Sequence, residues 1–267
     1  MKYPGSKWSI ADWIISYFPQ HHSYIEPFFG SGAVLFNKPR SNIETVNDLD
    51  GNVVNLFEWI RKDPERLARE IYYTPYARQV YDSAFESVPE DSFGRAVNFY
   101  IRLNMGHGFR TNGEKVGWKN DVQGRERAYA AKDWCNLPEK IMAAAERLRG
   151  VQIEYMPAVE LIKRFNHSNV LIYADPPYVL SARHGKQYRY EMDNGAQTEL
   201  LEVLHAHKGP VLISGYDSEL YNDSLHDWYR VETDCYSQIA SKKREVLWMN
   251  FAPAGQMSIK DFLEVRP

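Results

Sequence analysis

The chain has 267 residues, of which 44% are hydrophobic and 25% are charged, a composition typical of a folded globular protein. Its formal net charge of -3 excludes a surface uniformly covered with positive charge, so any contact with nucleic acid must come from a local basic patch. The length favours one large domain with an insertion, or two domains.

The positions of the cysteines and the lengths of the apolar runs further limit the classes of protein to which the chain can belong. Cys135 and Cys235 lie far apart and outside any CxxC or Cys/His spacing, so we expect neither a disulfide framework nor a metal site. No run approaches the roughly 18 apolar residues of a membrane helix, and the N-terminal residues lack the apolar stretch of a signal peptide. The sequence therefore predicts a cytoplasmic protein.

Short β-rich runs that alternate with helix-like segments predict an α/β fold with a parallel sheet. The expected strands are residues 24–28, 44–48, 151–155, 170–174 and 211–214. The run at 170–174 has almost no polar alternation, which is typical of a central strand covered on both faces. Two later runs, at 229–233 and 245–251, favour an antiparallel hairpin at the edge of this sheet.

The first expected strand leads into the turn EPFFGSG at residues 26–32. Here Phe28, Gly30, Ser31 and Gly32 lie between a strand and a helix. Glycines at such a turn let a ligand approach the backbone closely. The third glycine of the GxGxxG dinucleotide fingerprint is absent, so the turn alone is also consistent with a purely structural role.

Asp48 lies where the second expected strand ends. In doubly wound folds a carboxylate at that place commonly accepts hydrogen bonds from ribose hydroxyls. The alternative role is a helix N-cap, which suits Asp50 better because the next helical segment starts near Asn52. Asp48 is therefore a candidate ribose ligand.

Between residues 58 and 150 the strand signal fades and apolar residues recur at helical spacing. The expected helices are residues 64–71, 75–85, 93–103 and 137–148. Residues 104–134 are rich in Gly, Asn, Lys and Arg without a clear period, which predicts a long loop of the kind that is usually functional or disordered. We therefore expect residues 58–150 to be an insertion into a domain made of residues 1–57 and 151–267.

Basic residues outnumber acidic ones eight to three in residues 95–132. Such a local excess is what phosphate contacts need, although many charge runs are simply solvated surface. A second basic cluster lies between the two C-terminal strand-like runs, where an exposed hairpin turn is the alternative. The candidate nucleic-acid contacts are Arg110, Asn112, Lys115, Lys119, Arg125, Arg127, Lys242 and Lys243, with Asn112 as a base reader.

The motif Asp175-Pro176-Pro177-Tyr178 directly follows the buried run at 170–174. Because two prolines cannot extend a central strand, the chain must turn into a rigid loop at the carboxyl edge of the sheet, where α/β folds bind ligands. There Asp175 and the Pro176 carbonyl could each accept an N–H from an exocyclic amine, drawing its lone pair toward an incoming methyl group. Tyr178 could stack on the ring that carries the amine, a contact worth about 1–3 kcal/mol.

The chain resembles the Dam-type family of DNA adenine-N6 methyltransferases in four motifs and in their order. These motifs are KYPGSK at residues 2–7, EPFFGSG at 26–32, NDLD at 47–50 and DPPY at 175–178. An insertion before DPPY resembles the alpha group of this family, in which the insertion is the target-recognition domain. The resemblance extends from Lys2 to about Phe251. It implies a Rossmann-like class I methyltransferase sheet in a bacterial or phage-encoded protein.

The resemblance also implies a site-specific enzyme that transfers a methyl group from S-adenosylmethionine to N6 of an adenine flipped out of duplex DNA. Tyr3 and Lys7 would contact the cofactor, and the turn from Phe28 to Gly32 would line its methionine portion. Asp48 would hold its adenosine, and Asp175 would lie between the cofactor and the target amine. A restriction endonuclease acting on the same site is one partner that the resemblance allows. The sequence leaves open whether the enzyme belongs to such a pair, stands alone or comes from a phage, and it leaves the oligomeric state open.

Two alternatives remain beside this interpretation. Cytosine-N4 methyltransferases have a related loop that more often begins with Ser than with Asp, and an inactive relative could keep the fold for DNA binding alone. Cytosine-C5 methylation is disfavoured because it needs a nucleophilic cysteine, typically after a proline. In this chain Trp134 precedes Cys135, and Asp234 precedes Cys235.

Overall fold

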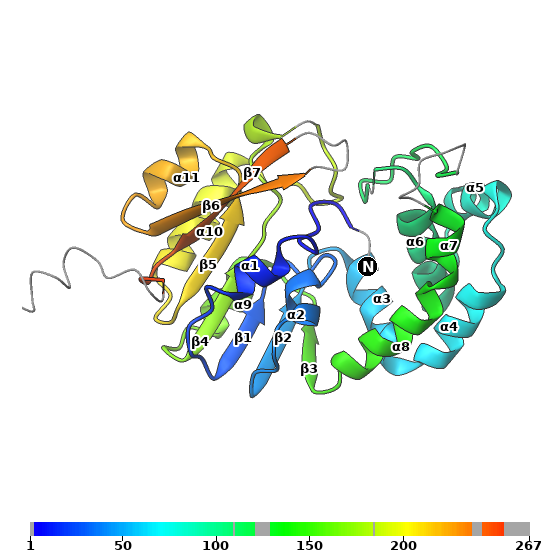
Figure 1. The fold of residues 1–267 in the computed structure, drawn as a ribbon, viewed down its shortest axis with the longest axis horizontal. Coiled ribbons are helices and arrows are strands. Elements are labelled where there is room, and N and C mark those ends of the chain that lie inside the picture. The colour runs from blue at the N-terminus through cyan, green and yellow to red at the C-terminus, as the bar shows by residue number, and fades with distance from the viewer. Residues whose placement is uncertain (1–2, 109, 121–128, 184, 237–241, 254–267) are drawn as a thin grey trace, which may run out of the picture.

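The computed structural model describes residues 3–108, 110–120, 129–183, 185–236 and 242–253. A seven-stranded sheet with strand order β3-β2-β1-β4-β5-β7-β6 forms its centre (Figure 1). The strands are β1 Ser23–Glu26, β2 Ile43–Asn47, β3 Val151–Glu154, β4 Val170–Ala174, β5 Val211–Gly215, β6 Tyr229–Tyr236 and β7 Lys242–Met249. Strands β1 to β5 are parallel, and β7 pairs antiparallel with both β5 and β6. The expected Rossmann-like sheet with an antiparallel edge hairpin is confirmed.

Helices cover both faces of this sheet. One face packs against α1 Ala11–Ile15, α2 Ala33–Asn37 and α3 Gly51–Lys62. The other packs against α9 Ala158–Arg164, α10 Asn194–His205 and α11 Glu219–Ser224. In β4, Leu171 and Tyr173 belong to the first core cluster and Ile172 to the second. The apolar run at 170–174 is therefore buried on both sides, as its lack of polar alternation indicates.

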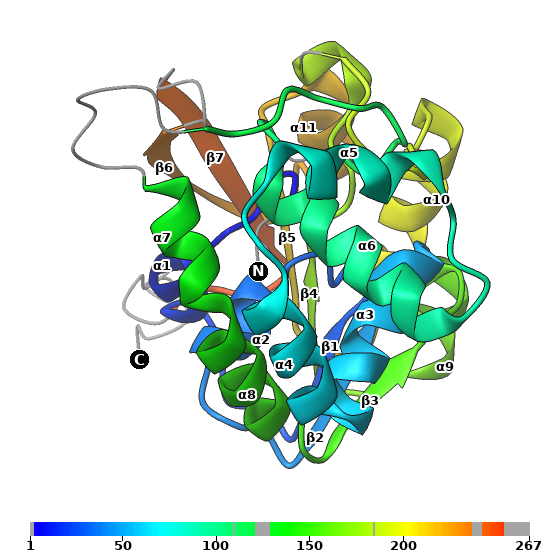
Figure 2. The ribbon, with the colours of Figure 1, turned by 90° about the vertical axis from the view of Figure 1, so that its right-hand side faces the viewer.

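The helical insertion lies beside β3 and α3, at one end of the sheet (Figures 1 and 2). Its helices are α4 Pro64–Tyr73, α5 Arg78–Glu86, α6 Ser92–Met105, α7 Ala130–Cys135 and α8 Leu137–Arg147. Helix α4 packs along α8, α5 packs along α6, and α3 contacts both α6 and α8. Among the described residues, no helix is long and apolar enough to span a membrane.

The expectation of one loop over residues 104–134 is wrong at both ends. Helix α6 continues to Met105, and α7 begins at Ala130. Trp134 of α7 is buried and donates its indole N–H to the Thr74 carbonyl at 3.0 Å, which fixes α7 against the end of α4. A six-residue helix is too short to show a hydrophobic period, so no pattern in the sequence predicts it.

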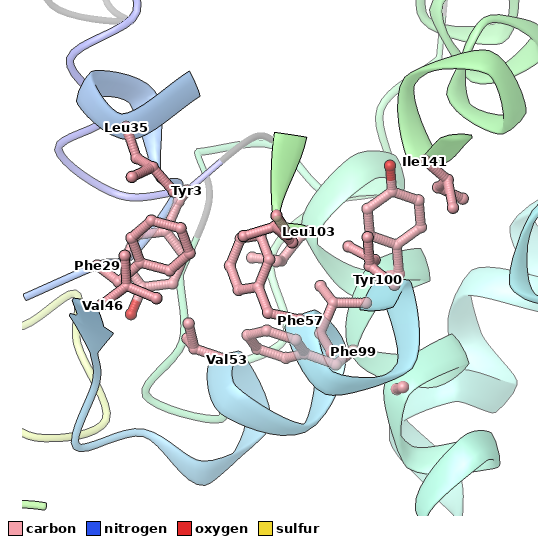
Figure 3. Packing of buried hydrophobic residues seen from close by; sticks show 14 of the residues in the cluster. Tyr3, Phe29, Leu35, Val46, Val53, Phe57, Phe99, Tyr100, Leu103 and Ile141 are labelled. Atoms are coloured by element: carbon pink, nitrogen blue, oxygen red, sulfur yellow. The ribbon is translucent and has the colours of Figure 1, made fainter. Parts of the chain in front are cut away.

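The hydrophobic core is continuous between the sheet and the insertion (Figure 3). The rings of Phe29 and Phe57 lie 4.5 Å apart between centroids, and Phe99 and Tyr100 of α6 belong to the same cluster. The expected boundary at residues 57 and 58 falls within α3. The two parts therefore share one helix and one core, and their division into domains stays a prediction.

A buried ionic contact also joins β2 to α8. Glu44 accepts two hydrogen bonds from Arg147, at 2.6 and 2.8 Å, and a third from Lys38 at 2.6 Å. These partners hold the pKa of Glu44 below its ordinary value, although burial alone would raise it. A carboxylate held by two charged side chains fixes the insertion to the start of β2.

Candidate active site

A cavity of about 500 Å³ opens at the edge where the parallel strands end. Open α/β sheets bind their ligands at this edge. The sequence-predicted residues in its walls are Tyr3, Lys7, Phe28, Gly30, Ser31, Asp48, Asp175 and Pro177. The N-terminal segment, the glycine turn, the end of β2 and the end of β4 therefore contribute to one cavity.

The glycine turn needs both of its glycines. Gly30 has φ +47°, and a Cβ atom on it would lie 2.9 Å from the ring of Tyr3. Gly32 has φ +67° and lies behind the cavity wall, where a Cβ atom would meet the rings of Phe29 and Phe36. Ser31 is buried, with its hydroxyl 2.9 Å from that of Ser6. The turn is thus packed against the N-terminal segment, and Gly30 and Ser31 line the cavity.

Asp48 lies at the end of β2 with its carboxylate in the cavity wall. It accepts hydrogen bonds from the Gly30 N–H at 2.9 Å and the Asp50 N–H at 2.8 Å. Burial raises the pKa of Asp48 to about 7, although these two N–H groups lower it. Asp50 accepts from the Asn52 N–H and caps α3, as expected, so the two aspartates have different roles.

Asn47 is a structural residue of the site that the sequence reasoning missed. Its amide donates to the Pro27 carbonyl at 2.9 Å and to the Met156 carbonyl at 3.0 Å, and it accepts from the Met156 N–H at 3.0 Å. One side chain therefore ties together the loops after β1, β2 and β3. The sequence feature that could have predicted this role is the amide side chain directly before Asp48, because an amide can donate and accept hydrogen bonds at the same time.

The Asp175 elbow is fixed from two sides. The Ser214 hydroxyl at the end of β5 donates to Asp175 Oδ1 at 2.9 Å. The Pro177 carbonyl accepts from the Gln197 amide of α10 at 2.7 Å, and Gln197 in turn accepts from the Tyr221 hydroxyl. Pro176 is buried beneath the elbow. The side chain of Asp175 stays 20% exposed, so its carboxylate remains accessible from the cavity.

Lys7 is buried, and its ammonium lies between two carboxylates. Its Nζ is 2.9 Å from Asp175 Oδ1 and 3.5 Å from Glu245 Oε1, and it donates to the Gly5 carbonyl at 2.7 Å. Burial by itself would lower the pKa of Lys7, but Asp175 and Glu245 outweigh it and raise that pKa. Lys7 is therefore a charged group that directly contacts the residue at the end of β4.

Tyr178 packs inward from the elbow and is 8% exposed. Its hydroxyl donates to Glu245 of β7, its ring lies edge-on against Tyr216 at 4.6 Å, and the Lys7 ammonium lies 4.8 Å from its centroid. Burial raises the pKa of Tyr178. One ring face that could receive a base is thus occupied by Lys7 in this conformation.

A segment at residues 185–192 closes over the N-terminal motif and was also missed. The Tyr188 hydroxyl lies so close to Gly5 that a Cβ atom there would be 2.5 Å from it. The Gln187 carbonyl accepts from the Thr111 N–H at 2.9 Å, and the Arg189 N–H donates to the Thr111 hydroxyl at 3.2 Å. The segment therefore lines the cavity and also contacts the basic part of the insertion.

The described basic residues of the insertion are exposed or half-buried, and some are already paired. Arg110 forms an ion pair with Glu114, and Lys115 forms one with Asp82 at 2.8 Å. Asn112 donates its amide to the Lys186 carbonyl at 3.3 Å. The Lys119 backbone is fixed by hydrogen bonds to Met105 and Tyr76. Arg125 and Arg127 lie outside the described residues, as do the side chains of Lys242 and Lys243 in β7.

Comparison with known proteins identifies relatives of this arrangement. A DNA adenine methylase of Salmonella typhi is 25% identical over 252 residues, covering 86% of this chain and 84% of that protein. One of Escherichia coli (strain K12) is 25% identical over 245 residues, covering 86% and 83%. A DNA N-6-adenine-methyltransferase of Escherichia phage P1 is 23% identical over 251 residues, covering 86% of this chain but 31% of that protein.

A family described as D12 class N6 adenine-specific DNA methyltransferase matches residues 3–235. The match includes the N-terminal segment, the glycine turn, the end of β2, the insertion and the Asp175 elbow. The family description names adenine N6, and so favours adenine over the cytosine-N4 alternative. The chain belongs to the D12 class of N6 adenine-specific DNA methyltransferases.

Proposed function

We propose that the enzyme binds S-adenosylmethionine in the cavity at the sheet edge and methylates N6 of an adenine flipped out of duplex DNA at a specific site. The observation that carries this proposal is that Asp175 shares one cavity with Gly30 and Asp48. The Asp175 carboxylate, which can accept a hydrogen bond from an amine, thus lines the same cavity as the glycine turn and the candidate ribose ligand Asp48.

The cavity has the size and charge that this cofactor requires. Its volume of about 500 Å³ lies within the range of about 300–1,000 Å³ typical of small-molecule sites. The cofactor carries a sulfonium and an ammonium against one carboxylate, so a wall with excess negative charge would favour it. Among the described residues, that wall contains Lys7, Lys163 and Arg189 against Asp50, Glu160, Asp175, Glu191 and Glu199. Glu26 and Asp48 also lie there, but burial raises their pKa values to about 8 and about 7, so they add less negative charge at neutral pH.

Three features of the chain would hold the cofactor. Gly30 lines the cavity, and its lack of a side chain lets the Tyr3 ring pack against the turn. The Asp48 carboxylate has acceptor capacity for ribose hydroxyls beyond its two backbone hydrogen bonds. When bound, S-adenosylmethionine supplies an electrophilic methyl group on a positively charged sulfur.

Asp175 and Pro176 would orient the amine. The nitrogen lone pair of adenine N6 is delocalised into the ring, so the amine is a weak nucleophile. Two acceptors, the Asp175 carboxylate and the Pro176 carbonyl, would take one N–H each and leave the lone pair directed at the methyl group. Ser214 keeps Asp175 in place through a 2.9 Å hydrogen bond. Most of the rate enhancement would come from this alignment, which can contribute up to about 7–11 kcal/mol.

The insertion would hold the DNA while the base is extruded. A stacked base cannot reach a cavity behind the sheet edge, so it must be flipped at a cost of a few kcal/mol. Phosphate contacts from Arg110, Lys115 and Lys119 would offset this cost and give binding a steep salt dependence. The 185–192 segment joins these residues to the cavity through Thr111.

The test is transfer of tritium from S-[methyl-³H]adenosylmethionine into duplex DNA of varied sequence, followed by digestion to nucleosides. We expect label in N6-methyl-2′-deoxyadenosine and at a limited set of sites, which sequencing of modified adenines would identify. Label in N4-methyl-2′-deoxycytidine would show that the target base is cytosine and not adenine. Zero incorporation across all sequences, with intact DNA binding, would favour an inactive DNA-binding relative instead.

A further inference from the structure

Glu245 of β7 is a buried carboxylate without a role in the reaction proposed above. It is 3% exposed and lies next to Val246, which pairs with Gly215 at the end of β5. Its Oε1 accepts from the Tyr178 hydroxyl and lies 3.5 Å from the Lys7 ammonium. A buried charge is costly unless it has partners, so a carboxylate at this place requires an explanation.

The Lys7 ammonium contacts both side chains that are proposed to hold the target base, Asp175 and Tyr178. It lies 2.9 Å from Oδ1 of Asp175, the carboxylate proposed to accept the adenine N–H. It also lies 4.8 Å from the centroid of Tyr178, on a face that could stack against the base. A base can stack on this face of Tyr178 only if Lys7 moves away, and the movement breaks a charge-assisted contact with Asp175.

We propose that Glu245 is a positioning residue that receives the Lys7 ammonium when the target adenine enters. Moving a buried ammonium away from Asp175 without another partner would leave a charge unpaired in the interior, which is strongly unfavourable. Glu245 removes most of this cost, because its Oε1 needs only to close from 3.5 Å to hydrogen-bond distance. The Tyr178 hydroxyl stays on the same carboxylate and keeps the ring in place. This inference rests on the proposed function.

The first test compares Glu245→Gln with the wild type in single-turnover methyl transfer at saturating DNA and S-adenosylmethionine. The amide keeps an acceptor for Tyr178 but loses the charge that would receive Lys7. We expect the rate to fall by about tenfold to a hundredfold, the value of one hydrogen bond to a charged group, while both dissociation constants stay unchanged. A rate equal to the wild type would overturn the proposal.

Two further variants separate this role from a structural one. Glu232→Gln is the matched control, because Glu232 lies opposite Val246 in the same hairpin and pairs with Arg230 and Arg244. It should methylate at the wild-type rate, and an equal loss would indicate hairpin distortion and overturn the proposal. Tyr178→Phe removes only the hydroxyl contact to Glu245. If it reproduces the Glu245→Gln loss, Glu245 acts through Tyr178 and the ammonium role is wrong.

A structure of the wild type with duplex DNA and S-adenosylhomocysteine decides the question even if Glu245→Gln does not fold. We expect Lys7 Nζ closer to Glu245 than to Asp175, with an adenine amine at Asp175. Lys7 still paired with Asp175 beside a bound adenine would overturn the inference. A wild type that methylates no DNA would instead contradict the proposed function, so the two failures are distinguishable.

Discussion

The cavity edge of the sheet and the basic stretch at residues 106–120 are built in opposite ways. At the cavity, polar side chains such as Lys7, Asn47 and Ser214 are buried, and each is bound to other parts of the protein. In the insertion, Arg110 and Lys115 are exposed by 42% and 46%, and each is paired with a nearby acid. The proposed catalytic site is therefore preformed, whereas the side chains of the proposed DNA surface would have to exchange their acidic partners for phosphates.

This difference has an energetic meaning. Buried charged contacts are costly to break, because a partner left alone in the interior loses several kcal/mol. Exposed ion pairs contribute about 0–1 kcal/mol, so phosphates can replace the acidic partners at little cost. We therefore expect substitutions at the cavity to abolish function abruptly and those at the insertion to change affinity gradually.

The largest effect should come from Asp175→Ala. The variant removes the acceptor for the target amine, and we expect methyl transfer to fall by about 10²–10³ or below detection, with DNA binding mostly intact. Tritium transfer and gel-shift titration measure the two quantities. The matched control is Asp217→Ala, an acid just beyond the neighbouring strand β5 that pairs with Arg230 at 2.8 Å. Full activity of Asp175→Ala would contradict the assigned role.

Gly30→Ala should have the next largest effect. An alanine at φ +47° costs about 1–2 kcal/mol of strain, and its Cβ would also meet the Tyr3 ring at 2.9 Å. Gly150→Ala is the control, because φ is +81° there but nothing lies within 4 Å of the added atom. We expect calorimetry to show weaker cofactor binding, by about tenfold for each 1.4 kcal/mol lost, only in Gly30→Ala. Equal binding in both variants would remove the turn from the cofactor site.

The pH dependence of cofactor binding tests Asp48. Burial raises the pKa of Asp48 to about 7 in the free protein, and ribose hydroxyls donating to the carboxylate would lower it in the complex. Below pH 7, cofactor binding would then release a proton from Asp48. The affinity for the cofactor should therefore rise with pH, by at most about tenfold per pH unit, and become constant above about pH 7. Asp48→Asn should flatten this part of the curve. An unchanged profile in Asp48→Asn would assign the dependence to another group, such as Glu26.

Several residues that line the cavity at the sheet edge could be predicted because each belongs to a short motif in the sequence. A glycine turn, an aspartate at a strand end and a proline elbow each follow an apolar run, and parallel strands bring such ends to one edge. The capping role of Asp50 followed from the same reasoning and is confirmed by its hydrogen bond to Asn52.

The contacts that complete the site were not predictable, because they join distant segments. Tyr178 and Glu245 are 67 positions apart and meet only because β7 inserts antiparallel beside β5. The Lys7 contact to Asp175 likewise requires the N-terminal segment to lie over the end of β4. Neither contact leaves a periodic pattern or a motif spacing in the sequence. In the insertion, a charge excess indicated the region but not which cations already have acidic partners.

Lys119→Ala tests the basic stretch of the insertion, and we expect it to reduce DNA affinity by less than the cavity substitutions reduce function. Lys119 forms no ion pair with any described residue, and its backbone is fixed by Met105 and Tyr76. If it contacts one phosphate, its loss should weaken binding to all sequences alike and reduce the salt slope of log K by about one. Fluorescence anisotropy across a salt series measures the slope. An unchanged slope would place the phosphates elsewhere on the insertion.

The smallest expected effect is an increase in DNA affinity, in Asp82→Asn. Asp82 pairs with Lys115 at 2.8 Å, and both side chains are partly exposed. Asp82→Asn would leave the Lys115 ammonium available to DNA and remove one repulsive charge, so affinity should rise by a few-fold, in line with the small energy of exposed pairs. The same salt series should show a steeper slope than the wild type, and Lys115→Ala should cancel both changes. If Asp82→Asn binds more weakly, the ion pair itself presents Lys115 to the phosphates, and this part of the insertion is as preorganised as the cavity.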